Sequence, residues 1–92
     1  MKVNRVVVKY FSRHMLQTVD LAALFNTLFD IYGDNVTIEF VAMTEMERRA
    51  STDESALVPI VRNRFQIFET GVATAIQRRP DVEQALIAAE VK

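Results

Sequence analysis

The chain has 92 residues, 50% of them hydrophobic, with a formal net charge of −1 and no cysteine. A chain of this length forms one domain, here 1–92, and buries only about 60–65% of its unfolded surface. The balanced charge gives no general attraction to nucleic acid or acidic surfaces. Without cysteine there are no disulfides or thiolate ligands, and one histidine is too few for a zinc site. We therefore expect no metal and no cofactor.

The sequence also bears on compartment and association. The N-terminal apolar run is short, is interrupted by Lys9 and lacks a cleavage pattern, so it is not typical of a secretory signal. The remaining apolar stretches are too short to cross a membrane. We expect a cytoplasmic protein with no membrane association. Its hydrophobic content exceeds what a small core can bury, and such a surplus usually contacts a protein partner or a second copy of the chain.

The first half of the chain predicts a strand, a helix and a second strand. Residues 3–11 are rich in β-branched and aromatic side chains and alternate between two faces, as a strand does. Ser12 is placed to cap a helix over 13–32, which Gly33 would end in a left-handed conformation. Residues 36–42 alternate again. Strand, helix and strand in this order imply a right-handed crossover and two parallel strands.

Helical signals dominate the rest of the chain, apart from one ambiguous segment. Thr44 and Glu47 have the spacing of a capping box, which predicts a short helix over 45–50. Residues 72–78 predict one or two helical turns. Pro80 suits the first position of a final helix.

Residues 56–71 have two interpretations, on which the fold depends. As a helix, extending as far as residue 78, they would spread apolar and β-branched side chains around the axis. As a hairpin, VPIVRN and RFQIFE would be two strands joined at Arg62-Asn63, with Pro59 at a strand start or edge. We favour the hairpin. The helical alternative would give β-α-β followed by helices.

The favoured order is β-α-β-(α)-β-β-α, a small α/β sandwich that resembles the thioredoxin-like fold in its minimal form. That fold places its active-site motif after the first strand, where this chain has Ser12-Arg13-His14-Met15. A cis proline opens its later strand, where this chain has Val58-Pro59. Ser12 and Met15 replace the two redox cysteines, and cysteine-free members of the fold generally work as binding modules. A ferredoxin-like or other small α/β sandwich is the alternative.

Arginines form three pairs that could bind an acidic partner, phosphate or nucleic acid. They are Arg48, Arg49, Arg62, Arg64, Arg78 and Arg79. If the hairpin forms, Arg62 and Arg64 share a face near Arg78-Arg79. Acidic residues lie among all three pairs, so local ion pairing is the alternative. Independently of the arginines, the long helix presents a second candidate surface, since its stripe includes Phe25, Phe29 and Tyr32 and is wide for packing on one sheet.

These features favour a non-enzymatic protein–protein interaction module that acts as a regulator, an inhibitor or an assembly subunit. It would bind another protein or form a homodimer. The alternative is a nucleic-acid-binding accessory protein that uses the arginine pairs. An enzyme would have to work through Ser12 and His14, and no acidic residue lies nearby in sequence to orient the histidine. We therefore predict no catalytic activity.

Overall fold

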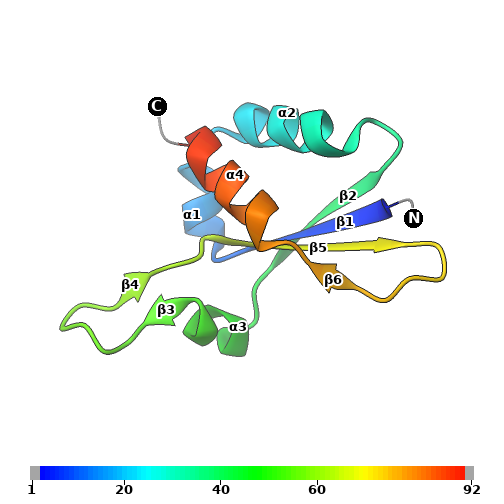
Figure 1. The fold of residues 1–92 in the computed structure, drawn as a ribbon. Coiled ribbons are helices and arrows are strands. Elements are labelled where there is room, and N and C mark those ends of the chain that lie inside the picture. Colours follow the sequence, from blue (N-terminus) through cyan, green and yellow to red (C-terminus); the bar gives the residue numbers. More distant parts are fainter. Residues whose placement is uncertain (1–2, 91–92) are drawn as a thin grey trace.

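The structure is a computed structural model that describes residues 3–90 and has a mixed α/β fold, as predicted (Figure 1). The helices are α1 (Arg13–Gln17), α2 (Leu21–Tyr32), α3 (Glu45–Ala50) and α4 (Pro80–Glu90). The strands are β1 (Val3–Tyr10), β2 (Thr37–Ala42), β3 (Thr52–Asp53), β4 (Ile60–Val61), β5 (Phe65–Gly71) and β6 (Gln77–Arg78). No helix in this part of the chain has the length and apolar character needed to cross a membrane.

Four of the strands form a mixed sheet in the order β2-β1-β5-β6 (Figure 1). β1 pairs in parallel with β2, from Arg5 opposite Thr37 to Tyr10 opposite Ala42, without a break in register. On its other side β1 is antiparallel to β5, and β5 is antiparallel to β6. The predicted parallel pair of strands is therefore confirmed.

The hydrophobic core lies between this sheet and the helices α2 and α4, which cover the same face of it (Figure 1). Val6 and Val8 of β1 point into the core and are fully buried, as alternation along a half-buried strand requires. Leu24 and Leu28, one helical turn apart on α2, pack against them. The other buried members of the cluster are Phe65, Ile67, Val82 and Leu86.

The caps predicted for two helices are present. The Ser12 hydroxyl accepts a hydrogen bond from the Met15 amide at 3.1 Å at the start of α1. Thr44 and Glu47 form both bonds of the capping box, so α3 covers the predicted residues. Pro80 is the first residue of α4, also as predicted.

The single helix predicted over 13–32 is wrong, because the structure has two helices there. Thr18 ends α1, and its hydroxyl donates to a carbonyl of the last turn at 2.7 Å. Asp20 begins α2 by accepting from the Ala23 amide at 3.1 Å. Thr and Asp side chains compete for backbone hydrogen bonds and so favour helix ends, an effect that apolar periodicity does not register. Gly33 ends α2 with a φ of +76°, as predicted.

The hairpin predicted for 56–71 is wrong in its pairing, and the helical alternative is wrong as well. Its second half is a strand, β5, but β5 pairs with β1 and β6. Its first half supplies only β4, which pairs with β3 in a separate two-stranded sheet. The Arg62 and Asn63 amides both donate to the Ser51 carbonyl, at 2.7 and 3.3 Å, so this segment is held at the end of α3. Alternation identifies a strand but does not identify its partner.

The helical turns predicted for 72–78 are wrong, since this segment turns the chain back and forms β6. Ala73 has a φ of +57° in the turn, and Arg78 lies opposite Phe68 in the ladder. Pro59 precedes β4 and not β5, and no peptide bond in the described part of the chain is cis. Val58-Pro59 therefore does not correspond to a strand-opening cis proline. The wider thioredoxin-like resemblance stays a prediction.

Candidate functional site

Helices α2 and α4 cover one face of the sheet, and we call the opposite face the open face. Its side chains alternate with those of the core along β1, β2 and β5. They are Arg5, Val7, Lys9, Thr37, Glu39, Val41, Phe68 and Thr70. Gln66 is also on this side, but it is buried beside Ser51 at the end of the sheet near α3. The open face is therefore closed at one end and uncovered along the rest of β1 and β5.

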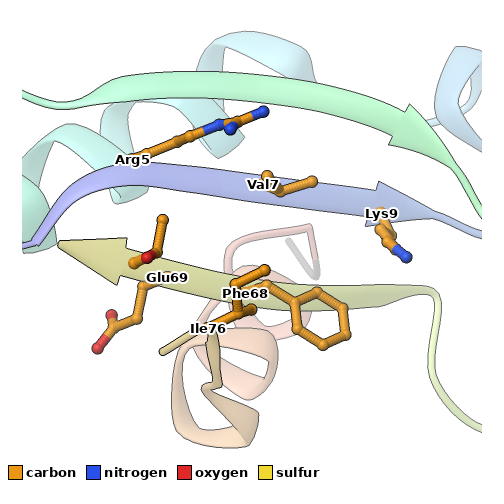
Figure 2. A pocket seen from close by; sticks show the side chains of 7 residues that line it. Arg5, Val7, Lys9, Phe68, Glu69 and Ile76 are labelled. Carbon is orange, nitrogen blue, oxygen red and sulfur yellow. The ribbon is translucent and has the colours of Figure 1, made fainter. Parts of the chain in front are cut away.

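A shallow pocket of about 260 Å³ lies in the open face, between β1 and β5 (Figure 2). It is lined by Arg5, Val7, Lys9, Phe68, Glu69, Thr70 and Ile76. Ile76, which is 72% exposed, reaches the pocket from the segment between β5 and β6. Small-molecule sites usually occupy roughly 300–1,000 Å³. This pocket is smaller than that, so it suits one or two side chains of a partner better than an enclosed cofactor.

The two cations of the pocket are each held by a carboxylate. The Arg5 side chain extends from β1 toward β2 (Figure 2). It donates there to Glu39 at 2.9 Å, and this bond raises the pKa of Arg5. Lys9 Nζ lies 2.6 Å from a Glu47 oxygen of α3 and 5.2 Å from the centre of the Phe68 ring. Burial favours a higher pKa for Glu47, but the hydrogen bonds from Lys9 and from its helix cap outweigh burial and lower that pKa. The pocket thus offers apolar contacts beside charges that are already paired.

Three residues of the predicted sites, Tyr32, Arg78 and Arg79, lie together where α2, β5 and α4 meet. The Tyr32 hydroxyl donates to one oxygen of Glu69 at 2.8 Å, and Arg79 donates to the other at 2.8 Å. Burial, and then this bond to Glu69, raise the pKa of Tyr32. Arg79 also donates to both carboxylate oxygens of Asp81, at 2.9 and 2.7 Å. These hydrogen bonds raise the pKa of Arg79 and lower that of Asp81 to about 2.

Arg78 belongs to a second ion pair at the same junction. Its guanidinium donates to both oxygens of Glu83, at 3.0 and 2.9 Å. Glu83 is only 2% exposed and also accepts the amide hydrogen of Ile67 on β5, at 2.9 Å. This carboxylate therefore joins α4 to both β5 and β6. Arg78 and Arg79 thus have structural contacts that attach the last helix to the sheet.

The other predicted arginines are distributed over α3 and the segment that leads into β5. Arg48 donates to the Met43 carbonyl at 2.8 Å, and Arg49 forms an exposed i,i+4 pair with Glu45. Arg62 lies 2.7 Å from Asp53, whose pKa is lowered to about 2 by hydrogen bonds from Ser55 and Arg62. Arg64 lies between β4 and β5. The predicted hairpin does not form, so the basis for placing Arg62 and Arg64 on one face is lost.

The aromatic residues predicted on the long helix lie partly exposed along α2. Phe25 is 37% exposed and Phe29 is 45% exposed, and their rings stack with centroids 6.1 Å apart. The Phe25 ring also lies 5.2 Å from that of Phe40 on β2. Leu24 and Leu28 fill the core from the same helix. The apolar stripe of α2 is therefore wider than its buried contact.

Sequence reasoning missed several strongly exposed apolar side chains. Leu57, Val58 and Ile60 lie on the β3–β4 hairpin and are 105%, 76% and 57% exposed, and Ile76 lies at the pocket. The sequence held one signal for the exposed apolar surface at the pocket. The first strand has apolar residues on both of its faces, including Val7. A strand with helices on only one side exposes its second apolar set.

Ser12 and His14 are both at the start of α1, where the Ser12 hydroxyl is used as a helix cap and His14 is exposed. Among residues 3–90, no group of three or more His, Asp or Glu side chains is arranged to hold a metal ion. Comparison of the chain with protein-family models, curated proteins and solved structures found no match. The function is therefore inferred from the geometry of the molecule itself.

Proposed function

We propose that this chain is a non-enzymatic, cytoplasmic protein–protein interaction module, and that a partner protein binds its open face. The observation that carries the proposal is a pocket of about 260 Å³ in the open face, where half-buried Val7 and Phe68 lie beside exposed Ile76, with exposed Val41 on the neighbouring strand β2. Contiguous exposed apolar surface marks interaction sites in soluble proteins. Paired charges around it match the polar rim that surrounds an interface core.

The kind of partner follows from the size and charge of the pocket. Arg5 and Lys9 are already held by Glu39 and Glu47, so an acidic partner would have to displace those carboxylates. A segment that inserts one or two apolar side chains between β1 and β5 needs no such exchange. The role that suits this contact is that of a regulator, an inhibitor or an assembly subunit.

Nucleic-acid binding is the second candidate function, because Phe68 and two cations lie on an open sheet, as in single-strand platforms. Phe65 and Tyr10 belong to the helix-covered face, so β1 and β5 present only Phe68 for stacking among their described residues. Each nearby cation also has a carboxylate partner. These contacts favour a protein partner over a nucleic acid.

The test compares two single charge insertions at exposed positions. Ile76→Glu places a carboxylate at the pocket, and Leu57→Glu places one on the β3–β4 hairpin. Tagged wild-type protein and both variants are incubated with nuclease-treated lysate from the source, and bound proteins are quantified by mass spectrometry. We expect a stoichiometric protein on the wild type and on Leu57→Glu, reduced about tenfold or more on Ile76→Glu.

Two results would contradict this proposal. Equal retention by all three proteins would show that the open face is not the binding surface. Binding that disappears with nuclease and reappears with added single-stranded nucleic acid, falling as salt rises, would establish the second candidate function instead.

A further inference from the structure

The outer edge of β2 is a regular strand edge, and no strand of the described residues 3–90 lies beside it. β2 is the first strand in the order β2-β1-β5-β6, and it pairs with β1 (Figure 1). Natural proteins usually protect such edges with lysine, proline, a bulge or a very short strand. β2 has six residues, TIEFVA, in continuous register, and its single charge, Glu39, is paired with Arg5 of the same chain. This edge therefore lacks the usual protection.

An apolar helix face lies beside the same edge. Phe25 of α2 contacts Phe40 of β2, and Phe29 stacks on Phe25 one turn further along. Leu21 lies one turn before Phe25 and is 43% exposed. The row formed by Leu21, Phe25 and Phe29 thus continues the surface of the β2 edge. Unpaired backbone groups and exposed apolar side chains occur there together.

We propose that a second copy of the chain occupies this surface, with the two β2 strands antiparallel about a two-fold axis. Such an interface needs a patch that is complementary to itself. A strand edge that pairs antiparallel with an identical edge meets this condition, because the N–H groups of each copy face the C=O groups of the other. The pairing would join two four-stranded sheets into one of eight strands, with the two α2 helices side by side above it.

Charge and shape select one register for this pairing. In this dimer the helix-covered faces of the two sheets lie on the same side. A two-fold axis that keeps them there passes through one residue pair, so one residue of β2 lies opposite the same residue of the other copy. Centring on Glu39 would oppose two carboxylates, which is destabilising. Centring on Phe40 opposes two aromatic rings next to Phe25 and places Glu39 opposite Val41. The register centred on Phe40 is therefore the one we assign.

The exposed areas indicate that both the strand and the helix are needed. A phenylalanine buries 150–250 Å² in full, so the exposed fractions of Phe25 and Phe29 amount to roughly 55–110 Å² per ring. Four rings in the dimer then supply roughly 220–440 Å², well below the ~1,200 Å² of a stable interface. Strand pairing and the flanking side chains must provide the remainder. Loss of either component should separate the subunits.

The experiment measures the dissociation constant by sedimentation velocity over a concentration series. Phe29→Glu charges the helix row, and Ile31→Glu is its matched control, because Ile31 is 43% exposed on the same helix but off the row. Val41→Glu places a carboxylate opposite Glu39 of the other copy, twice per dimer, whereas Val41→Lys places an ammonium there. Circular dichroism checks that every variant is folded.

We expect a dimer for the wild type and Ile31→Glu. We also expect one for Val41→Lys, although lysine often protects edges, because this ammonium would lie opposite a carboxylate, Glu39 of the other copy. Phe29→Glu and Val41→Glu should each raise the dissociation constant about tenfold or more. A wild type that is monomeric at ~100 μM, where even a weak interface would be populated, would overturn the inference. A dissociation constant that is unchanged in both Phe29→Glu and Val41→Glu would also overturn it. Ile76→Glu should leave the dimer intact, so this result is separate from the test of the open face.

Discussion

Glu83 is the buried carboxylate that joins the last helix to the sheet, and its removal should cost a large part of the stability of the protein. The side chain is 2% exposed, accepts the Ile67 amide at 2.9 Å and holds both donors of the Arg78 fork. Glu83→Ala removes all three contacts and leaves the amide of a fully buried residue without an acceptor. The same change leaves a guanidinium without its carboxylate.

The two losses differ in size because the two donors differ in exposure. An unsatisfied buried amide costs about 1–3 kcal/mol. Arg78 is 41% exposed, so water can solvate its guanidinium, and the ion pair itself contributes about 1 kcal/mol or less. We therefore expect Glu83→Ala to lower the free energy of unfolding by about 1–4 kcal/mol. A domain of this size has only about 5–15 kcal/mol in total.

Urea unfolding followed by circular dichroism, at one fixed protein concentration, measures this loss. Glu83→Gln keeps an oxygen for the Ile67 amide but loses the charge and one of the two acceptors for Arg78, so its loss should be about 1 kcal/mol, smaller than that of Glu83→Ala. Glu45→Ala removes an exposed carboxylate from its pair with Arg49 and should change stability by about 0.5 kcal/mol or less. If Glu83→Ala is as stable as Glu45→Ala, the structural role assigned to this carboxylate is wrong.

Three further predictions concern the backbone and the pH dependence of stability. Gly33→Ala should cost about 1–3 kcal/mol in urea unfolding, because φ +76° and ψ −172° suit glycine alone, although a Cβ there would meet no atom within 4 Å. Burial raises the pKa of Tyr32 above its unfolded value. The unfolded chain therefore loses this proton first, stability falls as pH rises above about 10, and in Tyr32→Phe that part of the fall should be absent from thermal melts. The Arg79 bond lowers the pKa of Asp81 to about 2, against 3.8 ordinarily. Its stabilisation is complete at neutral pH and is lost between about pH 5 and 2, so Asp81→Asn should flatten the acid limb of the melting curve, and an unchanged limb would contradict this assignment.

Features decided by neighbouring residues were predictable from the sequence. Ser12 and the Thr44–Glu47 box cap helices because a hydroxyl or carboxylate meets amides three residues away. Pro80 begins α4 for an equally local reason, namely its fixed φ and missing amide hydrogen.

Features decided by distant residues were not predictable. Residues 72–78 contain nothing that forbids a helix, yet β6 forms there because β5 offers a free edge and Glu83 holds Arg78 beside it. β5 was recognised as a strand, but its place beside β1 depends on a pairing across more than fifty residues, for example Val8 with Ile67.

The candidate site shows the same division between local and distant information. Alternation assigns Val7 and Phe68 to the face opposite the core of their strands. Whether that face is covered depends on where the helices pack. Two helices, α2 and α4, lie on one side, whereas α3, with six residues, reaches only the end of the other side through Glu47 and Lys9. The open face therefore depends on where the segment between β2 and β5 packs, which no motif reports.

The two proposals together predict a bivalent surface. A two-fold axis through Phe40, perpendicular to the sheet, keeps both open faces on the same side, so the dimer would present two pockets to one partner assembly. Two linked sites can raise apparent affinity by about 10²–10⁴ without any new contact. Phe29 lies outside the pocket, so Phe29→Glu should separate the dimer without changing either pocket. Binding to a densely immobilised partner, which uses both pockets, should weaken by about 10²-fold, and binding to the same partner free in solution should stay unchanged. Equal weakening in both formats would mean that the α2 row contacts the partner directly, and the bivalent arrangement would then be wrong.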